Sequence, residues 1–204
     1  MKNKSLLITI VILFIAVYSF AQATGTFTDS RDGKTYKTVK IGTQTWMAEN
    51  FAYKAKTGCW LYNNDQNNLA IYGYLYDWET AKKSCPSGWH LPSEAEWKTL
   101  TNYLGGPRGG ACVAGGKLKE KGTTHWKTPN SGATNESGFS AVPGGIRMLD
   151  GTFDRMGNVG YWWSSTEYNS DVYKYTSMGS GNSCAGSDSN SGKTAGFSVR
   201  YIKD

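Results

Sequence analysis

Two segments rich in tryptophan, glycine and proline constrain the fold of this chain more than any periodic pattern does. The first is residues 85–93, with the sequence CPSGWHLPS, and the second is residues 160–165, GYWWSS, with GFSVR following at residues 196–200. Large rings within short loops have few ways to pack, so these segments define a scaffold. They do not identify a reaction.

The N-terminus predicts a signal peptide over residues 1–21. Two lysines precede an apolar run over residues 6–17, and the small residues Ser19 and Ala21 favour cleavage after Ala21. The apolar run is too short to be a comfortable membrane span, and no second such run follows. We therefore expect an exported protein (periplasmic, secreted or at the cell surface) with no transmembrane segment after cleavage.

The charge of the chain argues against a nucleic-acid partner. The formal net charge is +6, of which two lysines belong to the predicted signal peptide. The remaining excess is scattered as single lysines and forms no arginine-rich stripe of the kind that follows a phosphate backbone. This is an ordinary solubility charge, and the length of 204 residues suits one domain with a real core.

Four cysteines in an exported chain predict disulfides and no metal centre. Cys59, Cys85, Cys112 and Cys184 form no Cys-x-x-Cys pair, and the chain has only two histidines, so the spacing of zinc ligands is absent. Four cysteines allow three pairings, and the residues alone leave the choice open. No cofactor is expected.

The pattern of residues predicts an α+β fold with two short helices and an antiparallel sheet. Strands are expected within residues 26–47, a first helix over residues 77–84, and a second helix after Ser93, where Glu96 completes a capping box. From residue 117 onward, short strands alternate with loops rich in Gly, Asn and Ser. The C-terminal half is therefore expected to be loop-rich.

The residues that suggest catalysis have structural explanations. Glu94 and Glu96 lie in a first helical turn, where negative charge and capping are favourable. His90 lies between Trp89 and Leu91 and is expected to be a hydrogen-bonded structural histidine. His125 has no partner in sequence, and the Gly-x-Ser-x-Gly elbow is absent. No catalytic residue is assigned.

A series of motifs in order along the chain resembles one known family. The motifs are WMAEN at residues 46–50, the Tyr/Gly/Trp segment at residues 72–78, CPSGWHLPS at 85–93, AGGKL at 114–118, GFSA at 138–141, PGG at 143–145, WWSS at 162–165 and GFSVR at 196–200. They are similar to the Fibrobacter succinogenes major paralogous domain family. The resemblance implies such a domain over residues 37–204, preceded by an N-terminal extension or hairpin over residues 22–36.

The resemblance further implies a C-type lectin-like fold, related to the formylglycine-generating sulfatase-modifying domains. The related oxidases need a reactive cysteine pair in the C-terminal region, where this chain has only Cys184. Glu-Pro-Asn and Trp-Asn-Asp motifs for calcium-dependent sugar binding are also absent. Family members often carry a cysteine where this chain has Tyr201. The resemblance therefore implies a disulfide between Cys59 and Cys85, and whether Cys112 pairs with Cys184 stays open.

Most tryptophans are expected in the core, because burying large rings gives a loop-rich domain its core. Core roles are expected for Trp46, Trp89, Trp97 and one of Trp162 and Trp163, and surface positions for Trp60 and Trp126. In the C-terminal segment, Met178, Ala185, Phe197 and Val199 are expected to point inward.

The composition of residues 161–196 is the main functional signal. Tyr, Ser, Gly and Asn supply 21 of these 36 residues, a mixture typical of antibody paratopes, although a plain solvated loop has the same composition. A ligand-binding surface is predicted with these outward side chains: Tyr168, Asn169, Asp171, Tyr173, Tyr175, Ser177, Asn182 and Asp188. Replacing Tyr173 and Tyr175 with alanine is then expected to abolish ligand retention without lowering the melting temperature.

The resulting hypothesis is an exported, non-catalytic ligand-binding or adhesion domain that presents this surface to a surface glycan or a protein ligand. Similar lectin-like domains serve as variable proteins of diversity-generating retroelements, and the composition of the segment is compatible with that role. The alternatives are a sulfatase-modifying type of oxidase or a polysaccharide-acting enzyme, and a structural module of a surface layer or fimbria.

Overall fold

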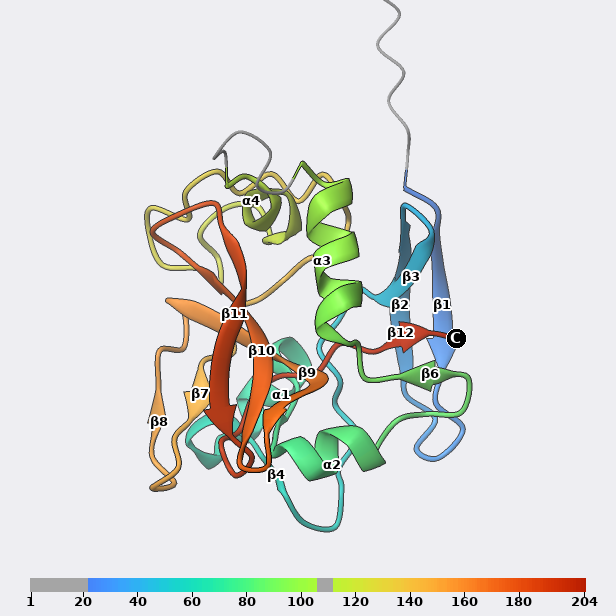
Figure 1. The fold of residues 1–204 in the computed structure, drawn as a ribbon, viewed down its shortest axis with the longest axis vertical. Coiled ribbons are helices and arrows are strands. Elements are labelled where there is room, and N and C mark those ends of the chain that lie inside the picture. Colours follow the sequence, from blue (N-terminus) through green and yellow to red (C-terminus); the bar gives the residue numbers. More distant parts are fainter. Residues whose placement is uncertain (1–21, 106–111) are drawn as a thin grey trace, which may run out of the picture.

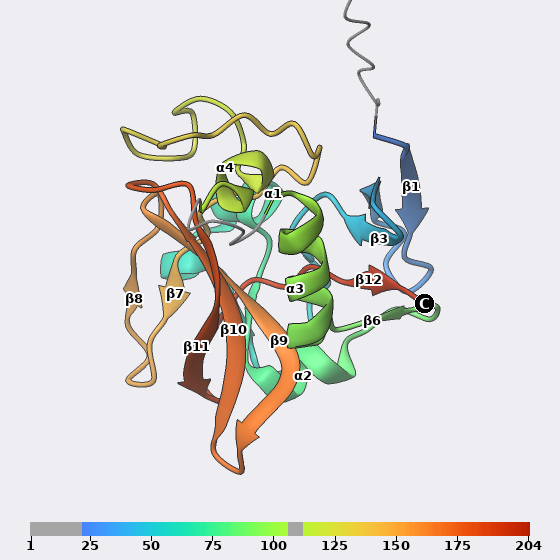
Figure 2. The same ribbon diagram turned by 45° about the horizontal axis from the view of Figure 1, so that its top comes forward.

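The computed structural model describes residues 22–105 and 112–204, so the signal peptide expected over residues 1–21 lies outside the described residues. The fold is α+β with short helices and antiparallel sheets, as the sequence predicts. A five-stranded sheet lies on one side of the molecule and a three-stranded sheet on the other, with helix α3 between them (Figures 1 and 2). In the described part of the chain, no helix has the length and apolar character needed to span a membrane.

The five-stranded sheet joins the two ends of the described chain. Its order is β1 (Thr24–Thr28), β2 (Thr35–Ile41), β3 (Gln44–Met47), β12 (Ile202–Lys203) and β6 (Trp89–His90). All neighbouring pairs are antiparallel, and Ile202 lies between Trp46 and His90. The strands predicted within residues 26–47 are therefore confirmed, and the N-terminal hairpin belongs to the same sheet as the C-terminal strand.

The three-stranded sheet is formed by the C-terminal half. It contains β9 (Val159–Asn169), β10 (Val172–Gly179) and β11 (Ala185–Gly192), in the order β11-β10-β9. Strand β11 was not predicted, because its Ser, Gly and Asn residues have little intrinsic strand preference. Antiparallel pairing with β10 provides the hydrogen bonds that hold it. Two short hairpins complete the structure: β4 (Cys59–Trp60) with β5 (Leu75–Tyr76), and β7 (Ile146–Arg147) with β8 (Phe153–Asp154).

Both predicted helices are present. Helix α2 (Trp78–Lys83) begins after Asp77, whose side chain accepts a hydrogen bond from Thr80 N, and α3 (Glu94–Tyr103) begins with the complete capping box of Ser93 and Glu96. The expectation of only two helices is wrong. Two shorter α-helices, α1 (Leu69–Tyr72) and α4 (Ala114–Leu118), and two single 3₁₀ turns, η1 (Tyr62–Asn64) and η2 (Gln66–Asn68), also occur.

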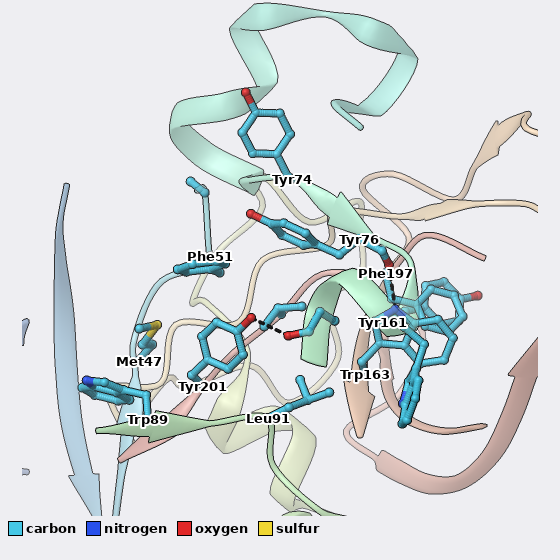
Figure 3. Packing of buried hydrophobic residues seen from close by; sticks show 14 of the residues in the cluster. Met47, Phe51, Tyr74, Tyr76, Trp89, Leu91, Tyr161, Trp163, Phe197 and Tyr201 are labelled. Atoms are coloured by element: carbon cyan, nitrogen blue, oxygen red, sulfur yellow. Dashed lines mark hydrogen bonds between the residues drawn. The ribbon is translucent and has the colours of Figure 1, made fainter. Parts of the chain in front are cut away.

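Aromatic rings make up much of the core. In one of two clusters, the rings of Trp163 and Phe197 lie 4.2 Å apart between their centres, and Phe51 packs edge-on against Tyr201 at 4.8 Å (Figure 3). The second cluster lies under α3 and includes Trp46, Trp97 and Trp162. Packing of this kind lets short elements enclose a stable core.

The structure confirms most of the predicted core positions. Trp46, Trp89 and Trp97 are buried, as are both Trp162 and Trp163, and Met178, Phe197 and Val199 point inward, with Ala185 partly buried. The surface position expected for Trp126 is wrong: its ring is 1% exposed and its Nε1 donates to Ala141 O at 2.9 Å. Trp60 is half-buried beneath the guanidinium of Arg147, which lies 4.0 Å from the centre of its ring.

The disulfide between Cys59 and Cys85 implied by the resemblance is wrong. Cys112 and Cys184 form the disulfide, and Cys59 and Cys85 are free thiols. The thiol of Cys85 interacts with Tyr201, the position at which the resemblance implies a cysteine in other members. Burial of the Cys85 thiol raises its pKa to about 11, so the thiol stays protonated.

Lys119 anchors the loop between β10 and β11. Its side chain is fully buried, and its ammonium group donates to three backbone carbonyls, those of Ser131 at 3.0 Å, Gly179 at 2.9 Å and Asn182 at 2.7 Å. Burial lowers the pKa of Lys119 to about 8, so the group is still mostly protonated at neutral pH. This cation holds the end of the three-stranded sheet through main-chain atoms alone.

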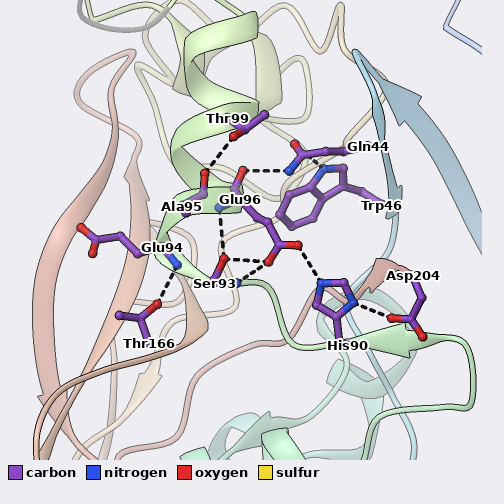
Figure 4. A network of polar contacts seen from close by, with 10 residues as sticks. All are labelled: Gln44, Trp46, His90, Ser93, Glu94, Ala95, Glu96, Thr99, Thr166 and Asp204. Atoms are coloured by element: carbon purple, nitrogen blue, oxygen red, sulfur yellow. Dashed lines mark hydrogen bonds and ion pairs between the residues drawn. The ribbon is translucent and has the colours of Figure 1, made fainter.

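His90 links the C-terminus to helix α3, as expected of a structural histidine. Its Nδ1 lies 2.6 Å from Asp204 Oδ1 and its Nε2 lies 2.7 Å from Glu96 Oε1 (Figure 4). Burial acts to lower the pKa of His90, but the hydrogen bonds to the two carboxylates raise it by a larger amount. The net pKa therefore lies above its ordinary value. Burial acts to raise the pKa of Glu96, but hydrogen bonds with Ser93 and His90 outweigh it, so the net pKa lies below its ordinary value.

We expect the stability that His90 contributes to depend on pH. A raised pKa in the folded state gives stability that is fully present below the unfolded pKa of about 6.5 and is lost as pH rises through the folded value. The free energy of unfolding of the His90→Gln variant should therefore lie further below that of the native protein at pH 6 than at pH 9. The groups are partly exposed, so the difference should be about 1 kcal/mol or less. Urea unfolding across this range measures it, and parallel curves for the two proteins would contradict it.

Candidate functional site

The predicted C-terminal surface does not form one patch. Tyr168 and Asn169 are the last residues of β9 and Asp171 lies in the turn that follows it, whereas Asn182 lies on the turn at the other end of β10. The eight residues of β10 separate the two turns by about 25 Å, at roughly 3.3 Å per residue. Of the four, Tyr168 is the large exposed side chain, with 61% of its surface accessible.

The outward orientation expected for Tyr173 is wrong. Its side chain is 5% exposed, its ring stacks on Trp78 with 3.9 Å between ring centres, and its hydroxyl donates to Ser170 O at 3.2 Å. Tyr175 is partly buried and packs edge-on against Phe197, at 4.8 Å between ring centres. Both rings therefore belong to the core.

The remaining predicted residues are divided between structural and surface positions. Asn182 supports its own turn, because its Oδ1 accepts from Cys184 N at 2.9 Å while its carbonyl accepts from Lys119. Ser177 is half-buried on β10. The side chain of Asp188 lies outside the described residues. Whether any of these residues binds a ligand stays a prediction.

A groove of about 700 Å³ lies elsewhere, between the N-terminal hairpin, helix α1 and the loops of residues 120–142. Strand β1 contributes Thr24 and Thr26 to its lining, and α1 contributes Leu69, Ala70 and Ile71. Helix α1 ends at Gly73, whose φ of 68° is in the left-handed region and whose missing Cβ avoids a clash with the carbonyl of Phe51. This close approach holds α1 against the segment of residues 50–52.

Two buried polar side chains, Arg200 and Asn50, lie in the floor of the groove. Arg200 is 1% exposed and Asn50 4%. The amide of Asn50 is fully used: its Oδ1 accepts from Trp162 Nε1 and Arg200 Nε, and its Nδ2 donates to Tyr72 O and Ser198 Oγ. The WMAEN and GFSVR motifs thus meet at this point, and their polar residues hold each other in place.

The guanidinium of Arg200 is held by neutral oxygen atoms. It donates from Nε to Asn50 Oδ1 at 2.8 Å, from Nη1 to Met47 O at 3.1 Å and Phe139 O at 2.7 Å, and from Nη2 to Ser140 O at 2.8 Å. Burial lowers the pKa of Arg200 to about 9, so the group carries its charge at neutral pH. A full positive charge therefore lies in the floor of the groove.

Ser140 brings one of these carbonyls into position through an uncommon backbone conformation. Its φ is 53°, which is rare for a residue other than glycine. The side chain of Asn135 holds it there, accepting from Ser140 N at 2.8 Å and donating to Ser140 Oγ at 2.9 Å. Strain of this kind persists only where the surroundings fix it, and here it directs a carbonyl toward Arg200.

A histidine–carboxylate pair lines the opposite part of the groove. His125 Nδ1 lies 2.8 Å from Glu120 Oε2 and 3.0 Å from Oε1, and the His125 ring packs edge-on against Tyr72. A carboxylate that orients a histidine in this way suits either ligand binding or general-base chemistry. Among the described residues, His125 makes no hydrogen bond to a serine hydroxyl or cysteine thiol, so a nucleophile–base pair is not formed.

Sequence reasoning missed the groove because its residues come from distant segments. The buried arginine follows a GFSV motif that reads as a core strand, and Asn50 lies in a motif recognised only for its family resemblance. Within residues 22–105 and 112–204, no three His, Cys, Asp or Glu side chains are grouped to hold a metal ion.

A family model described as the Fibrobacter succinogenes major domain matches residues 39–203 of the chain. The match includes both groove-floor residues, Asn50 and Arg200, and both partners of the disulfide. No match was found among curated proteins or among solved structures.

Proposed function

The chain belongs to the Fibrobacter succinogenes major domain family. We propose that it is an exported, non-catalytic ligand-binding or adhesion domain whose ligand lies in the groove. The observation that carries the proposal is the concave site itself. The groove combines apolar side chains on α1, hydroxyl groups on β1 and a few charged groups, and such a mixture is typical of ligand sites. The ligand is a carbohydrate or a protein at a surface.

We also propose that the fold is C-type lectin-like. Support comes from the antiparallel strands, the two longer helices α2 and α3, and the pairing of C-terminal strand β12 with β3 in the sheet that also contains the N-terminal hairpin. The loop-rich second half forms the three-stranded sheet. An experimental structure of the domain would test this relation directly.

Filling the groove is expected to abolish ligand retention. Ala70 is exposed and lines the groove from α1, so Ala70→Trp places a large ring in the space that a ligand would occupy. Retention on glycan and protein arrays should fall at least about tenfold while the melting temperature stays within a few degrees, because surface substitutions rarely change stability by more than about 0.5 kcal/mol. Asn67→Trp, on the exposed η2 turn outside the groove, is the matched control and should retain the ligand.

The turn between β9 and β10 is a second candidate for the ligand site. The exposure of Tyr168, next to Asn169 and Asp171, favours it, since an exposed tyrosine is an effective contact residue. The array separates the two sites. Loss of retention in Tyr168→Ala with normal retention in Ala70→Trp would reject the groove and support the turn. A retained ligand whose mass changes on incubation with the protein would reject the non-catalytic assignment.

A further inference from the structure

The positive charge in the floor of the groove has no carboxylate partner in the described part of the chain. All four hydrogen-bond acceptors of Arg200 are carbonyl or amide oxygens. Glu49 acts on its charge only at longer range and forms no ion pair with it. A buried charge without a counter-charge is costly, and an anion brought close to it offsets that cost.

The guanidinium also has a donor left for a ligand. An arginine side chain carries five N–H groups, and the four hydrogen bonds use one on Nε, two on Nη1 and one on Nη2. The second N–H of Nη2 has no acceptor among the described residues. Arg200 and Ser140, the acceptor of the other Nη2 N–H, both line the groove, so the groove is where we place an acceptor for this N–H.

The other charged groups of the groove restrict the kind of anion that fits. Lys34 and Lys37 add positive charge on the N-terminal hairpin, but Glu49 and Glu120 also line the groove. The two carboxylates repel a polyanion such as an acidic peptide. They are, however, good acceptors for ligand hydroxyl groups, since an ionised carboxylate only accepts hydrogen bonds. A ligand with one carboxylate and several hydroxyls satisfies both sets of groups.

Apolar side chains of the groove further restrict the kind of ligand that fits. Leu69, Ile71 and Val142 line the groove, and Ile71 is 41% exposed although it is apolar. The C–H faces of a sugar ring pack well against such side chains, while the ring hydroxyls reach Thr24 and Thr26. A uronic acid presents all of these features in one unit, namely a single carboxylate, several hydroxyls and an apolar face.

We propose that the groove binds an acidic carbohydrate containing a uronic acid, with its carboxylate at Arg200 Nη2 and its hydroxyls toward Glu49 and Glu120. The inference rests on the proposed function, because it names the class of ligand for the same groove. It differs from calcium-dependent sugar binding in that the protein's own cation holds the sugar.

The test compares galacturonic acid, which has one carboxylate, with its methyl ester; the ester keeps the ring hydroxyl groups and lacks the charge. The free acid should bind at least about tenfold more tightly by calorimetry, the factor expected from one charge-assisted hydrogen bond. Lys37→Gln should weaken the binding of the acid severalfold. Lys40 is exposed on the same strand but lies outside the groove, so Lys40→Gln should leave this binding unchanged. Because Arg200 variants are expected to lose stability, the ¹⁵N resonances of its side chain in the native protein provide the direct readout, and they should shift with the acid alone.

The outcomes separate this inference from the proposed function. Equal binding of acid and ester, both lost in Ala70→Trp, would keep the groove as a ligand site and overturn the acidic class. No binding of galacturonic acid, or binding unaffected by Ala70→Trp, would overturn the inference. Tighter binding of hexaglutamate than of galacturonic acid would also overturn it and would indicate a peptide ligand.

Discussion

Replacing Arg200 with methionine is expected to lower the free energy of unfolding by about 3 kcal/mol or more. The substitution leaves the carbonyls of Met47, Phe139 and Ser140 without the donor that they share, in a part of the molecule where water has little access. Each buried acceptor without a partner costs about 1–3 kcal/mol, and the low end of that range for three carbonyls gives the expected value. Urea unfolding followed by tryptophan fluorescence measures the change.

An opposing effect must be considered, because methionine also removes a charge that was costly to bury. Replacing a complete buried ion pair with apolar residues is often neutral or stabilising, since both polar partners are removed together. Here three of the four acceptors are main-chain carbonyls, and they remain after the substitution. Destabilisation should therefore prevail.

The control is Lys203→Met on the exposed side of β12, which should change stability by no more than about 0.5 kcal/mol. The loss of stability in Arg200→Lys should lie between those of Lys203→Met and Arg200→Met, because a single ammonium group cannot reach four acceptors arranged around a planar guanidinium. If Arg200→Met unfolds within 1 kcal/mol of the native protein, the hydrogen-bonded arrangement around Arg200 does not contribute as described.

A second large effect is expected at Tyr173. Tyr173→Ala removes a ring that is 5% exposed and stacked on Trp78, so it should lower the free energy of unfolding by about 3–5 kcal/mol, as for other buried aromatic residues. Tyr168→Ala, five residues earlier and 61% exposed, is the matched control and should stay within about 0.5 kcal/mol. Thermal unfolding of the two variants side by side tests the difference.

This expectation reverses the one drawn from the sequence, in which alanine at Tyr173 and Tyr175 leaves the melting temperature unchanged. A ligand-contact role for Tyr173 as an outward residue would regain support only if Tyr173→Ala were as stable as Tyr168→Ala. If both variants are strongly destabilised, the turn between β9 and β10 is more tightly packed than the exposure of Tyr168 indicates.

The reason for the error is that both faces of β10 are covered by core clusters. Met178 was correctly expected to point inward, and a strand alternates with a period of two, so Tyr175 and Tyr173 were placed on the outer face. The alternation holds, but Met178 packs in the cluster under α3, whereas Tyr173 and Tyr175 pack in or against the other cluster, so both faces of β10 are covered. No residue in the segment indicates that the second face is covered as well. Composition and alternation together could not predict it.

Local signals were read correctly from the sequence where a few neighbouring residues decide the structure. The capping box at Ser93 and Glu96 is of this kind, because side chain and backbone meet within three residues. His90 was recognised as structural, but its partners Glu96 and Asp204 were not, since one lies 114 residues away. The groove required contacts such as Asn50 to Arg200, separated by 150 residues, which no local pattern contains.

The anchoring of the loop between β10 and β11 by Lys119 has a consequence for how this domain can diverge. The ammonium group donates hydrogen bonds to the carbonyls of Gly179 and Asn182. Ser183 Oγ likewise donates to a carbonyl, that of Cys112, at 2.6 Å. Every amino acid provides a carbonyl, so two of these attachments persist whatever side chains the loop carries at residues 179 and 182. Relatives can therefore exchange residues here over evolutionary time while the loop stays fastened in the same place.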